Sequence, residues 1–499
     1  MKTSAVGSRW VSRTVEGALF VTGMIALGCV FFVASAHLQD RLYFEVIESV
    51  RMTQARYLNT GSILPPFFEH GYYGATRYLP IPVAFHAAIS LVFSDYVFGG
   101  KLLALTLGAV TVLAVVALAV RQRVGWALGT GLAGAAAGGI AFMRSTAGLG
   151  ADLVPVVFQL AGLALVERGT DRRRLVLAGF LCGLAVLSKP SAVWGAAAGG
   201  LLLLARRRVD ALIFLGSWAV VTGAGIWGLQ IASGGTFLED QVPLLFSSVS
   251  LGWGVAFERL ISALWGFAGA ALVVIALSVG IAWYRRSLTV WGSATLIHLP
   301  IALAIFRDPG AAENHLVDLM ILGPVWLGAL LSLAPEEDRA RRKLGTRARA
   351  MVGAVLALAL CGTIARQLGP PVLDTVVSLS SGTPVPGSEK DPLAEEVSEF
   401  DVILSEDAYV PFVRGHRPVV ADPYMFARVA ADRPGWDDPL VTRIERQEFT
   451  KVVLLHDLTE REWFSNYHFG PRVWQALSDN YVLGAASDGY FVYVPGPSR

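Results

Sequence analysis

Clusters of arginine separate the long apolar runs of this chain, and they constrain the fold more than any other feature. The clusters are Arg9 and Arg13, Arg121 and Arg123, Arg172 to Arg174, Arg206 to Arg208, Arg285 and Arg286, and Arg339 to Arg349. Loops rich in Lys and Arg stay on the cytoplasmic side of membrane proteins. Placing every cluster on that side therefore predicts which end of each apolar run faces the cytoplasm.

Alternate crossings between these clusters predict about eleven membrane spans, with a cytoplasmic N-terminus and an extracytoplasmic C-terminus. The expected spans are 16–36, 97–120, 125–143, 152–167, 174–188, 191–205, 210–232, 258–283, 288–306, 314–334 and 350–367. The apolar stretch 79–95 could be a further crossing, but it would then send every later cluster outside. We expect it to lie on, or dip into, the outer leaflet.

The composition supports a multi-pass membrane protein. Hydrophobic residues make up 54% of the chain and charged residues 16%, against about 25% charged residues in soluble domains. The first span resembles a signal peptide but is too long and has no clear small-residue cleavage site, so we expect it to remain as an anchor. Cys29, Cys182 and Cys361 all fall within predicted spans, which indicates neither a disulfide framework nor a cysteine metal site.

A first outer loop of roughly sixty residues, 37–96, is far longer than the usual connection between helices. Apolar side chains recur at helical spacing over residues 42–58 with charged side chains between them, which predicts an amphipathic helix at the outer interface. Pro65-Pro66 and the segment 71–74 then break the chain. We interpret the loop as a folded cap over a membrane-embedded cavity.

The chain changes character after the last predicted span. We expect a transmembrane domain over residues 1–370, a linker over 371–394 and a small extracytoplasmic α/β domain over 395–499. Strand-like runs in this last part are 402–404, 452–455 and 490–494. It contains no P-loop or dinucleotide fingerprint.

Ionisable and polar residues at the predicted outer ends of the spans and in the first outer loop form the candidate site. A charge at the centre of a membrane helix costs about 2.5 to 3.5 kcal/mol, so such residues usually face a bundle interior or a water-filled cavity. The candidates are Asp40, Glu45, Arg77, Tyr78, Arg144, Asp152, Lys189, Asn314 and His315, with Arg307, Asp308 and Glu313 in the same connection as the last two.

Each candidate also has a purely structural interpretation. Asp40 and Asp152 are good helix caps, and Glu313 and Asn314 suit a helix N-terminus. Arg144 and Lys189 could extend to lipid headgroups, as Arg77 could beside Tyr78. His315 could be a packing residue, and a histidine inside an apolar stretch, such as His298, is more often a core residue than a ligand.

Several short motifs, taken in order, resemble the GT-C superfamily of membrane glycosyltransferases. They are Asp40 directly after the first span, Arg77-Tyr-Leu-Pro80 in the long loop, Arg144 followed by Gly150-Ala-Asp152, Gly183-Leu-Ala-Val-Leu-Ser-Lys189-Pro190, and Gly310-Ala-Ala-Glu-Asn314-His315 before an apolar span. The resemblance covers most of residues 15–335. It is strongest to the protein O-mannosyltransferase and aminoarabinose-transferase (glycosyltransferase family 39-like) branch.

This resemblance implies transfer of a sugar from a polyprenyl-phosphate donor to an extracytoplasmic cell-envelope acceptor, with inversion at the anomeric carbon. The family's catalytic carboxylate is similar in place to Asp40, which would take the acceptor's hydroxyl proton. Arg77, Arg144 and Lys189 become candidates for binding the donor phosphate. The family often has paired acids in this loop, whereas here Arg41 follows Asp40 and Glu45 lies further along.

The expected partners are the lipid-linked donor, a lipid, glycan or protein acceptor and the membrane lipids, with no nucleic acid. No cluster of hard oxygen ligands is evident, so we expect no obligatory cofactor, although a divalent metal stays open. An alternative is a transporter or flippase of lipid-linked sugars or other polar solutes. Transporters commonly have matching repeats and broken midplane helices, which the sequence does not display. A third interpretation makes the terminal domain a binding or assembly module.

Overall fold

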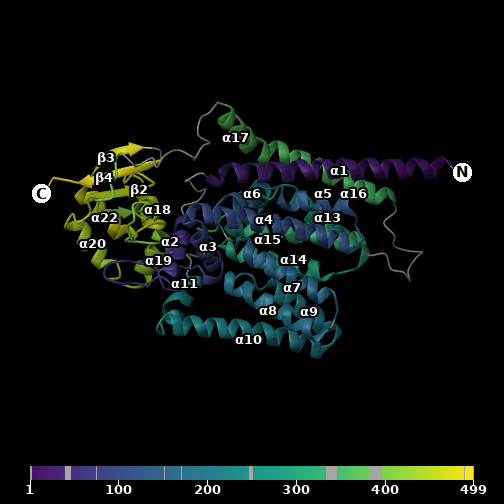
Figure 1. Cartoon of the computed structure of the whole chain (residues 1–499), viewed down its shortest axis with the longest axis horizontal. Helices are drawn as coiled ribbons and strands as arrows, with labels where there is room; N and C mark the ends of the chain where they lie inside the picture. The colour runs from purple at the N-terminus through teal and green to yellow at the C-terminus, as the bar shows by residue number, and fades with distance from the viewer. Residues whose placement is uncertain are drawn as a thin grey trace. The chain divides into compact units, whose positions relative to one another are not determined.

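A computed structural model describes most residues of the chain (Figure 1). These residues form two compact units. The described ranges are 3–39, 47–74, 76–150, 152–169, 171–246, 251–332, 346–381, 393, 396–487 and 489–497. The first unit, here called the helical unit, comprises Met1–Leu38, Lys101–Ala224 and Val249–Pro386. The second, here called the α/β unit, comprises Gln39–Gly100, Gly225–Ser248 and Gly387–Arg499.

Apolar helices build the helical unit, and two of its helices, α4 and α10, continue along the chain into segments of the α/β unit. The helices are α1 (Thr3–Ala36), α4 (Tyr96–Arg121), α5 (Trp126–Ala137), α6 (Ile140–Ala147), α7 (Leu153–Glu167), α8 (Arg172–Ser188), α9 (Trp194–Arg206), α10 (Arg208–Ala232), α12 (Trp253–Phe267), α13 (Ala270–Arg285), α14 (Val290–Ile305), α15 (Val317–Ser332), α16 (Thr346–Thr363) and α17 (Gly369–Ser381). Short 3-10 or π turns are η1 (His37–Gln39), η3 (Glu313–Leu316) and η4 (Ile364–Leu368).

The described helices confirm a multi-pass membrane protein. Five of them are long and apolar enough to cross a bilayer, and the number rises to seven if each of two bent helix pairs forms one span. Shorter apolar helices add Pro80–Phe93, Leu153–Glu167, Trp194–Arg206 and Val290–Ile305. The count of about eleven crossings stays a prediction, as does the sidedness of the termini.

Two predicted spans are bent rather than straight. The run 125–143 is divided into α5 and α6, which meet at 80°, and the run 258–283 into α12 and α13, which meet at 113°. The second break occurs at Gly269, whose φ of +55° is unfavourable for residues with a side chain. A Cβ there would also lie 2.5 Å from Thr363 Cγ2. Apolar periodicity extends through both breaks, which is why the sequence predicted single spans.

The core of the helical unit surrounds α15. In the most apolar 18-residue stretch of the segment Glu313–Ser332, which contains α15, 89% of the stretch is buried inside the protein. The corresponding stretch of α10 is only 17% buried, so α15 is central and α10 is peripheral. Helix α1 packs along both α5 and α16 (Figure 1). Its approach to α5 is close, because a Cβ on Gly134 would lie 2.6 Å from Gly23 Cα. Small residues at such crossings let membrane helices pack tightly.

The α/β unit combines a small sheet with short helices. Its helical elements are α2 (Ile47–Asn59), α3 (Pro80–Phe93), η2 (Phe237–Gln241), α11 (Val242–Phe246), α18 (Tyr409–Val413), α19 (Pro423–Asp432), α20 (Asp438–Glu445), α21 (Arg461–Asn466) and α22 (Pro471–Asn480). The strands are β1 (Ile403–Ser405), β2 (Lys451–Leu454), β3 (Tyr481–Ser487) and β4 (Tyr490–Pro495). The sheet order is β1-β2-β4-β3, with β1 and β2 parallel and the other neighbours antiparallel.

The predicted strands are confirmed, and β3 is an additional one. Strand β3 lies at the sheet edge, is mostly exposed, contains Gly484 and has an irregular register between Leu483 and Ala485. These features weaken the alternating apolar pattern by which a strand is predicted from sequence. The predicted linker from residue 371 is helical through Ser381 as part of α17.

The first outer loop and the C-terminal segment form one unit rather than two. Tyr73 pairs with Val420 in a parallel bridge, and its amide donates to Val419 O across 2.8 Å. Its ring is 1% exposed and meets Phe426 edge-on at 4.7 Å between centroids. Along α2 the charged residues Glu48 and Arg51 are buried as well. The predicted helix is therefore present, but two of its charged side chains are buried within the unit; its position at the outer interface stays a prediction.

Candidate functional site

Arg144 and Glu313 form an ion pair in the helical unit. Arg144 lies in the last turn of α6, and Glu313 begins η3, the short turn that leads into α15. The Arg144 side chain is 38% exposed and the Glu313 side chain 12%. Because one guanidinium nitrogen contacts Glu313, the other donors of this partly exposed group remain able to bind an anion.

A second pair joins Lys189 and Asp152. Lys189 Nζ lies 3.6 Å from Asp152 Oδ1, and the two side chains are 17% and 9% exposed. Asp152 occupies the N-cap position of α7, as its cap interpretation predicts, but its side chain makes no cap hydrogen bond there. Lys189 ends α8 and is held by this acid inside the unit, which disfavours its interpretation as a headgroup anchor.

Asp318 is a third acid in the same region, and the sequence analysis did not single it out. Its Oδ1 accepts a hydrogen bond of 2.8 Å from Trp194 Nε1, and its Oδ2 lies 4.0 Å from His298 Nε2. Lys189 is close enough to act electrostatically on the same histidine. The signal that could have found Asp318 is an acid inside an apolar span, because such residues are rare and usually functional. His298 is buried, as expected of a core histidine.

These residues gather at one end of the helical unit. Helix α8 starts with Arg172 to Arg174 and ends before Lys189, which puts about 25 Å between the two groups at 1.5 Å per residue. Arg144 and Asp152 are joined by a short connection, and Glu313 and Asp318 by η3. We call Arg144, Asp152, Lys189, Glu313 and Asp318 the charged cluster.

The loop before Glu313 is fixed by Arg259, another residue that sequence analysis missed. From α12, the Arg259 guanidinium donates to the carbonyl oxygens of Phe306, Asp308, Pro309 and Ala311, at 2.7 to 3.2 Å. Arg307 is held as well, because its Nε donates to Leu251 O at 3.0 Å. These bonds position the segment that carries Glu313, Asn314 and His315.

Asn314 and His315 follow Glu313 on η3. Asn314 Oδ1 is buried and accepts no hydrogen bond from the residues that the structure describes. Gln159 is similar, since its Oε1 accepts from Gly195 N at 2.5 Å while its Nε2 is buried with no partner among those residues. A buried polar atom left without a partner is costly and is often explained by a ligand or water.

Arg77 and Tyr78 belong to the α/β unit. The Arg77 guanidinium lies 5.4 Å from the ring centroid of Tyr424, and Arg51 lies 4.9 Å from that of Tyr78. Burial raises the pKa of Asp422, while the nearby Arg77 charge lowers it in part. Arg77 is therefore close to the C-terminal segment. Asp40 and Glu45 lie outside the described residues.

Two adjacent acids of the α/β unit, Glu406 and Asp407, are both buried, but their pKa values shift in opposite directions. Burial alone would raise the pKa of Glu406, but hydrogen bonds from His468 Nδ1 at 2.5 Å and Trp463 Nε1 at 2.6 Å lower it. Burial raises the pKa of Asp407 to about 7. Asp407 accepts hydrogen bonds from Tyr409 N at 2.9 Å and Tyr490 Oη at 2.8 Å.

No group of three or more His, Cys, Asp or Glu side chains in the described ranges is arranged to hold a metal ion. Asp40 and Glu45 are outside those ranges, so the metal requirement stays a prediction.

The chain has the fold of the solved structures of ArnT and AglB, which confirms the GT-C-like fold class predicted from the sequence. ArnT from Cupriavidus metallidurans bound to undecaprenyl phosphate matches with a TM-score of 0.59 and 15% identity over 96% of this chain and 99% of that chain. Its apo form matches with the same TM-score and 14% identity over 99% and 100% of the two chains.

The archaeal oligosaccharyltransferase AglB from Archaeoglobus fulgidus, in complex with an inhibitory peptide and a dolichol-phosphate, is also similar. It matches with a TM-score of 0.50 and 14% identity over 94% of this chain and 74% of that chain. No protein-family model and no curated protein matches the sequence. At such identities the similarity establishes the fold, and the chemistry has to be argued from this chain's own residues.

Proposed function

We propose that the chain is a membrane glycosyltransferase that moves a sugar from a polyprenyl-phosphate donor to an extracytoplasmic cell-envelope acceptor. The observation that carries the proposal is the charged cluster, in which two cations from separate segments are each paired with an acid at one end of a helical membrane unit. The ArnT and AglB structures similar to this chain hold undecaprenyl phosphate and dolichol-phosphate. A phosphate-bearing lipid is therefore the ligand that best suits this end of the unit.

The sidedness follows from the arginine clusters. Arg172 to Arg174 start α8 and Lys189 follows its end, so a cytoplasmic position for the former gives an extracytoplasmic position for the latter. The donor would enter from the bilayer with its phosphate toward Arg144 and Lys189. Their carboxylate partners orient both cations before the donor arrives.

The reaction needs a base for the acceptor hydroxyl and cations for the leaving polyprenyl phosphate. In the helical unit we assign the phosphate contacts to Arg144 and Lys189. From the sequence alone we keep Asp40 as the proposed base and Arg77 as a further candidate for donor binding. Attack of the acceptor oxygen on the anomeric carbon forms the new glycosidic bond as the bond to phosphate breaks, with inversion. The proton passes to Asp40, and the phosphate leaves as a dianion or monoanion paired with the cations.

Transfer by the purified full-length protein tests this proposal. The protein would be incubated with a panel of polyprenyl-phosphate hexoses, pentoses and aminosugars and with envelope fractions, and the products would be identified by mass spectrometry. Asp40→Asn should lower kcat by about 10²- to 10⁴-fold, the usual contribution of a general base, while donor binding persists. Arg144→Gln should raise KM for the donor, and Arg286→Gln, an exposed arginine outside the cluster, should leave both parameters unchanged.

Two outcomes contradict the proposal in different ways. Unchanged transfer by Asp40→Asn would remove Asp40 from the base role while keeping the enzyme class. Movement of a lipid-linked sugar or polar solute across proteoliposomes, with no transfer from any donor, would identify a transporter instead.

A further inference from the structure

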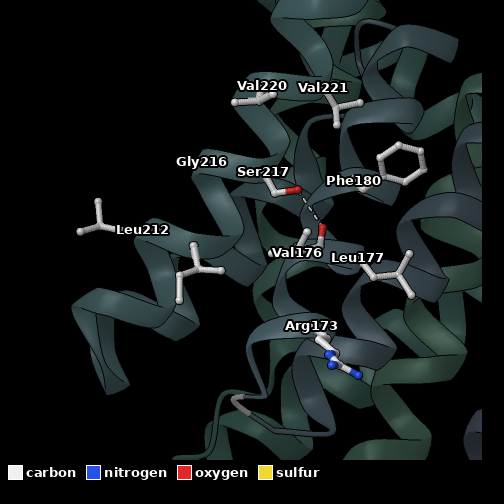
Figure 2. Close-up of a pocket in the computed structure, with 10 residues that line it drawn as sticks. Arg173, Val176, Leu177, Phe180, Leu212, Gly216, Ser217, Val220 and Val221 are labelled. Carbon is white, nitrogen blue, oxygen red and sulfur yellow. Dashed lines mark hydrogen bonds between the residues drawn. The ribbon is translucent and has the colours of Figure 1, made fainter.

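An apolar groove lies on the helical unit between α8 and α10, away from the charged cluster. Its volume is about 800 Å³, which is in the size range of small-molecule sites, and Arg173 is the one charged residue that lines it. Figure 2 shows Arg173 at one end of the groove and Val220 and Val221 at the other. The groove therefore has a long apolar part and a single cationic end.

The walls of the groove have almost no polar group that faces a ligand. Leu177 and Phe180 from α8, and Leu212 and Val220 from α10, are large apolar side chains with 42 to 70% of their surface exposed. The Ser217 hydroxyl donates to the Val176 carbonyl oxygen at 2.8 Å, so this polar group is satisfied within the wall (Figure 2). Such a surface on a peripheral membrane helix is suited to a hydrocarbon chain.

The cationic end has a net positive charge. Arg172 to Arg174 start α8, Arg206 ends α9 and Arg208 starts α10, while residues at these helix ends pack in one core cluster that includes Leu175, Leu203 and Ala211. Arg174 pairs with Asp171 and Arg207 with Asp210. Arg173 is an exposed residue, and the ion pairs of the described residues at this end of the helices involve Arg174 and Arg207 rather than Arg173. A phosphate would supply a negative partner.

We infer that this groove binds one anionic phospholipid, with an acyl chain along α8 and α10 and its phosphate at Arg173. Basic pockets between membrane helices are known to bind anionic headgroups in this way, through charge at the interface and apolar contact below it. The site lies at the opposite end of α8 from Lys189 and is independent of the sugar-transfer site.

Gly216 offers a direct test because it lines the groove with open space above it. An added Cβ at this position meets no atom within 4 Å, so Gly216→Trp should fill the groove without disturbing the fold. Gly280 on α13 has equally open space and does not line the groove, which makes Gly280→Trp the matched control. Arg173→Gln tests the headgroup contact, with Arg286→Gln as its control.

Native mass spectrometry of the full-length protein in detergent, titrated with phosphatidylglycerol or with phosphatidylcholine of the same acyl chains, measures the binding. We expect one phosphatidylglycerol per protein, bound about tenfold more tightly than phosphatidylcholine; that ratio corresponds to about 1.4 kcal/mol. Gly216→Trp should remove this lipid, and Arg173→Gln should abolish the preference while retaining weak binding. Both control variants should behave as wild type.

Three results would overturn the inference. Equal binding by the Gly216→Trp and Gly280→Trp variants would indicate a general lipid shell. Selective occupation by undecaprenyl phosphate, with no phosphatidylglycerol bound, would replace the phospholipid with an isoprenoid. A lipid-free dimer that only Gly216→Trp dissociates would put a second copy of the chain in the groove.

Discussion

Lys189 and Asp152 form an ion pair across 3.6 Å, although helices α7 and α8 separate them along the chain. Each side chain is mostly buried, so each charge contributes to stabilising the other in its buried position. This relationship has a structural and a functional consequence, and the two can be separated by a double-mutant cycle.

Lys189→Met or Asp152→Asn alone should destabilise the protein by about 3 kcal/mol, because each removes an opposite charge from a mostly buried neighbour. The double variant should be less destabilised than the sum of the two. Unfolding in detergent, followed by intrinsic fluorescence, measures these values. If Lys189 also binds donor phosphate, the double variant should remain defective in donor use despite its recovered stability; strictly additive losses of stability would contradict the pairing.

Arg259→Met should loosen the loop 306–311, because four carbonyl groups lose a charged donor at once. We expect a loss of about 2 to 4 kcal/mol, since hydrogen bonds to charged groups contribute more than neutral ones. Hydrogen–deuterium exchange should increase over residues 306–316 and stay constant in α1. The exposed Arg286→Met is the control, and unchanged exchange in Arg259→Met would show that other contacts fix the loop.

Tyr73→Ala should destabilise the α/β unit by about 3 to 5 kcal/mol, the usual cost of truncating a buried aromatic ring. The ring contacts Phe426 and Trp436, and its hydroxyl donates to Trp436 O at 3.3 Å. Limited proteolysis of the full-length protein should then cleave the C-terminal segment faster. Tyr467→Ala, at a more exposed tyrosine of the same unit, should have little effect; equal sensitivity of the two variants would contradict the central position of Tyr73.

The raised pKa of Asp407 predicts that the stability of the α/β unit falls as the pH rises toward 7. Its folded value of about 7 is above the ordinary 3.8, so the folded state binds the proton more tightly than the unfolded state. The contribution of this group to stability is therefore greatest below pH 4 and is lost as pH rises to 7. Asp407→Asn should remove that loss and stabilise the unit at pH 8 by at most about 4 kcal/mol.

Hydrogen–deuterium exchange of β1 and β4 between pH 5 and 8, corrected for intrinsic exchange rates, measures this difference. Asp457→Asn provides a contrast, because hydrogen bonds from Thr459 lower the pKa of Asp457, and its stabilising effect is lost as pH falls. A wild-type and an Asp407→Asn protein with the same pH profile would exclude a shifted Asp407.

The sequence allowed the membrane class, the GT-C fold and most strands of the sheet to be predicted, because apolar run lengths and alternation are local signals. It also selected Arg144, Asp152 and Lys189 as candidates from their place at the ends of apolar runs. Their pairing was less predictable: Glu313 was noted among the polar residues of its connection, but its contact with Arg144 depends on how distant segments pack. Arg259 and Asp318 were missed because they lie inside apolar helical stretches.

The bends at α5–α6 and α12–α13 show a related limit. A membrane span is predicted from hydropathy averaged over many residues. Each of these helix breaks depends instead on one or two glycines and on local contacts, such as the hydrogen bond of 3.2 Å that Ile140 N donates to Gln367 Oε1. The union of the first loop with the C-terminal segment likewise depends on pairing between Tyr73 and Val420, for which no local pattern exists.

Because the first outer loop packs with the C-terminal segment, the α/β unit can fold only after the end of the chain has been synthesised. Tyr73 emerges from the ribosome early, yet Phe426 and Trp436, which bury its ring, are made near the end of translation. The segment around Tyr73 therefore cannot complete its fold until the C-terminal residues are made, and its aromatic side chains stay exposed while the intervening helices are inserted. A chain that terminates before residue 420 leaves this segment without its fold, so nascent-chain quality control should recognise such a product by its exposed aromatic surface.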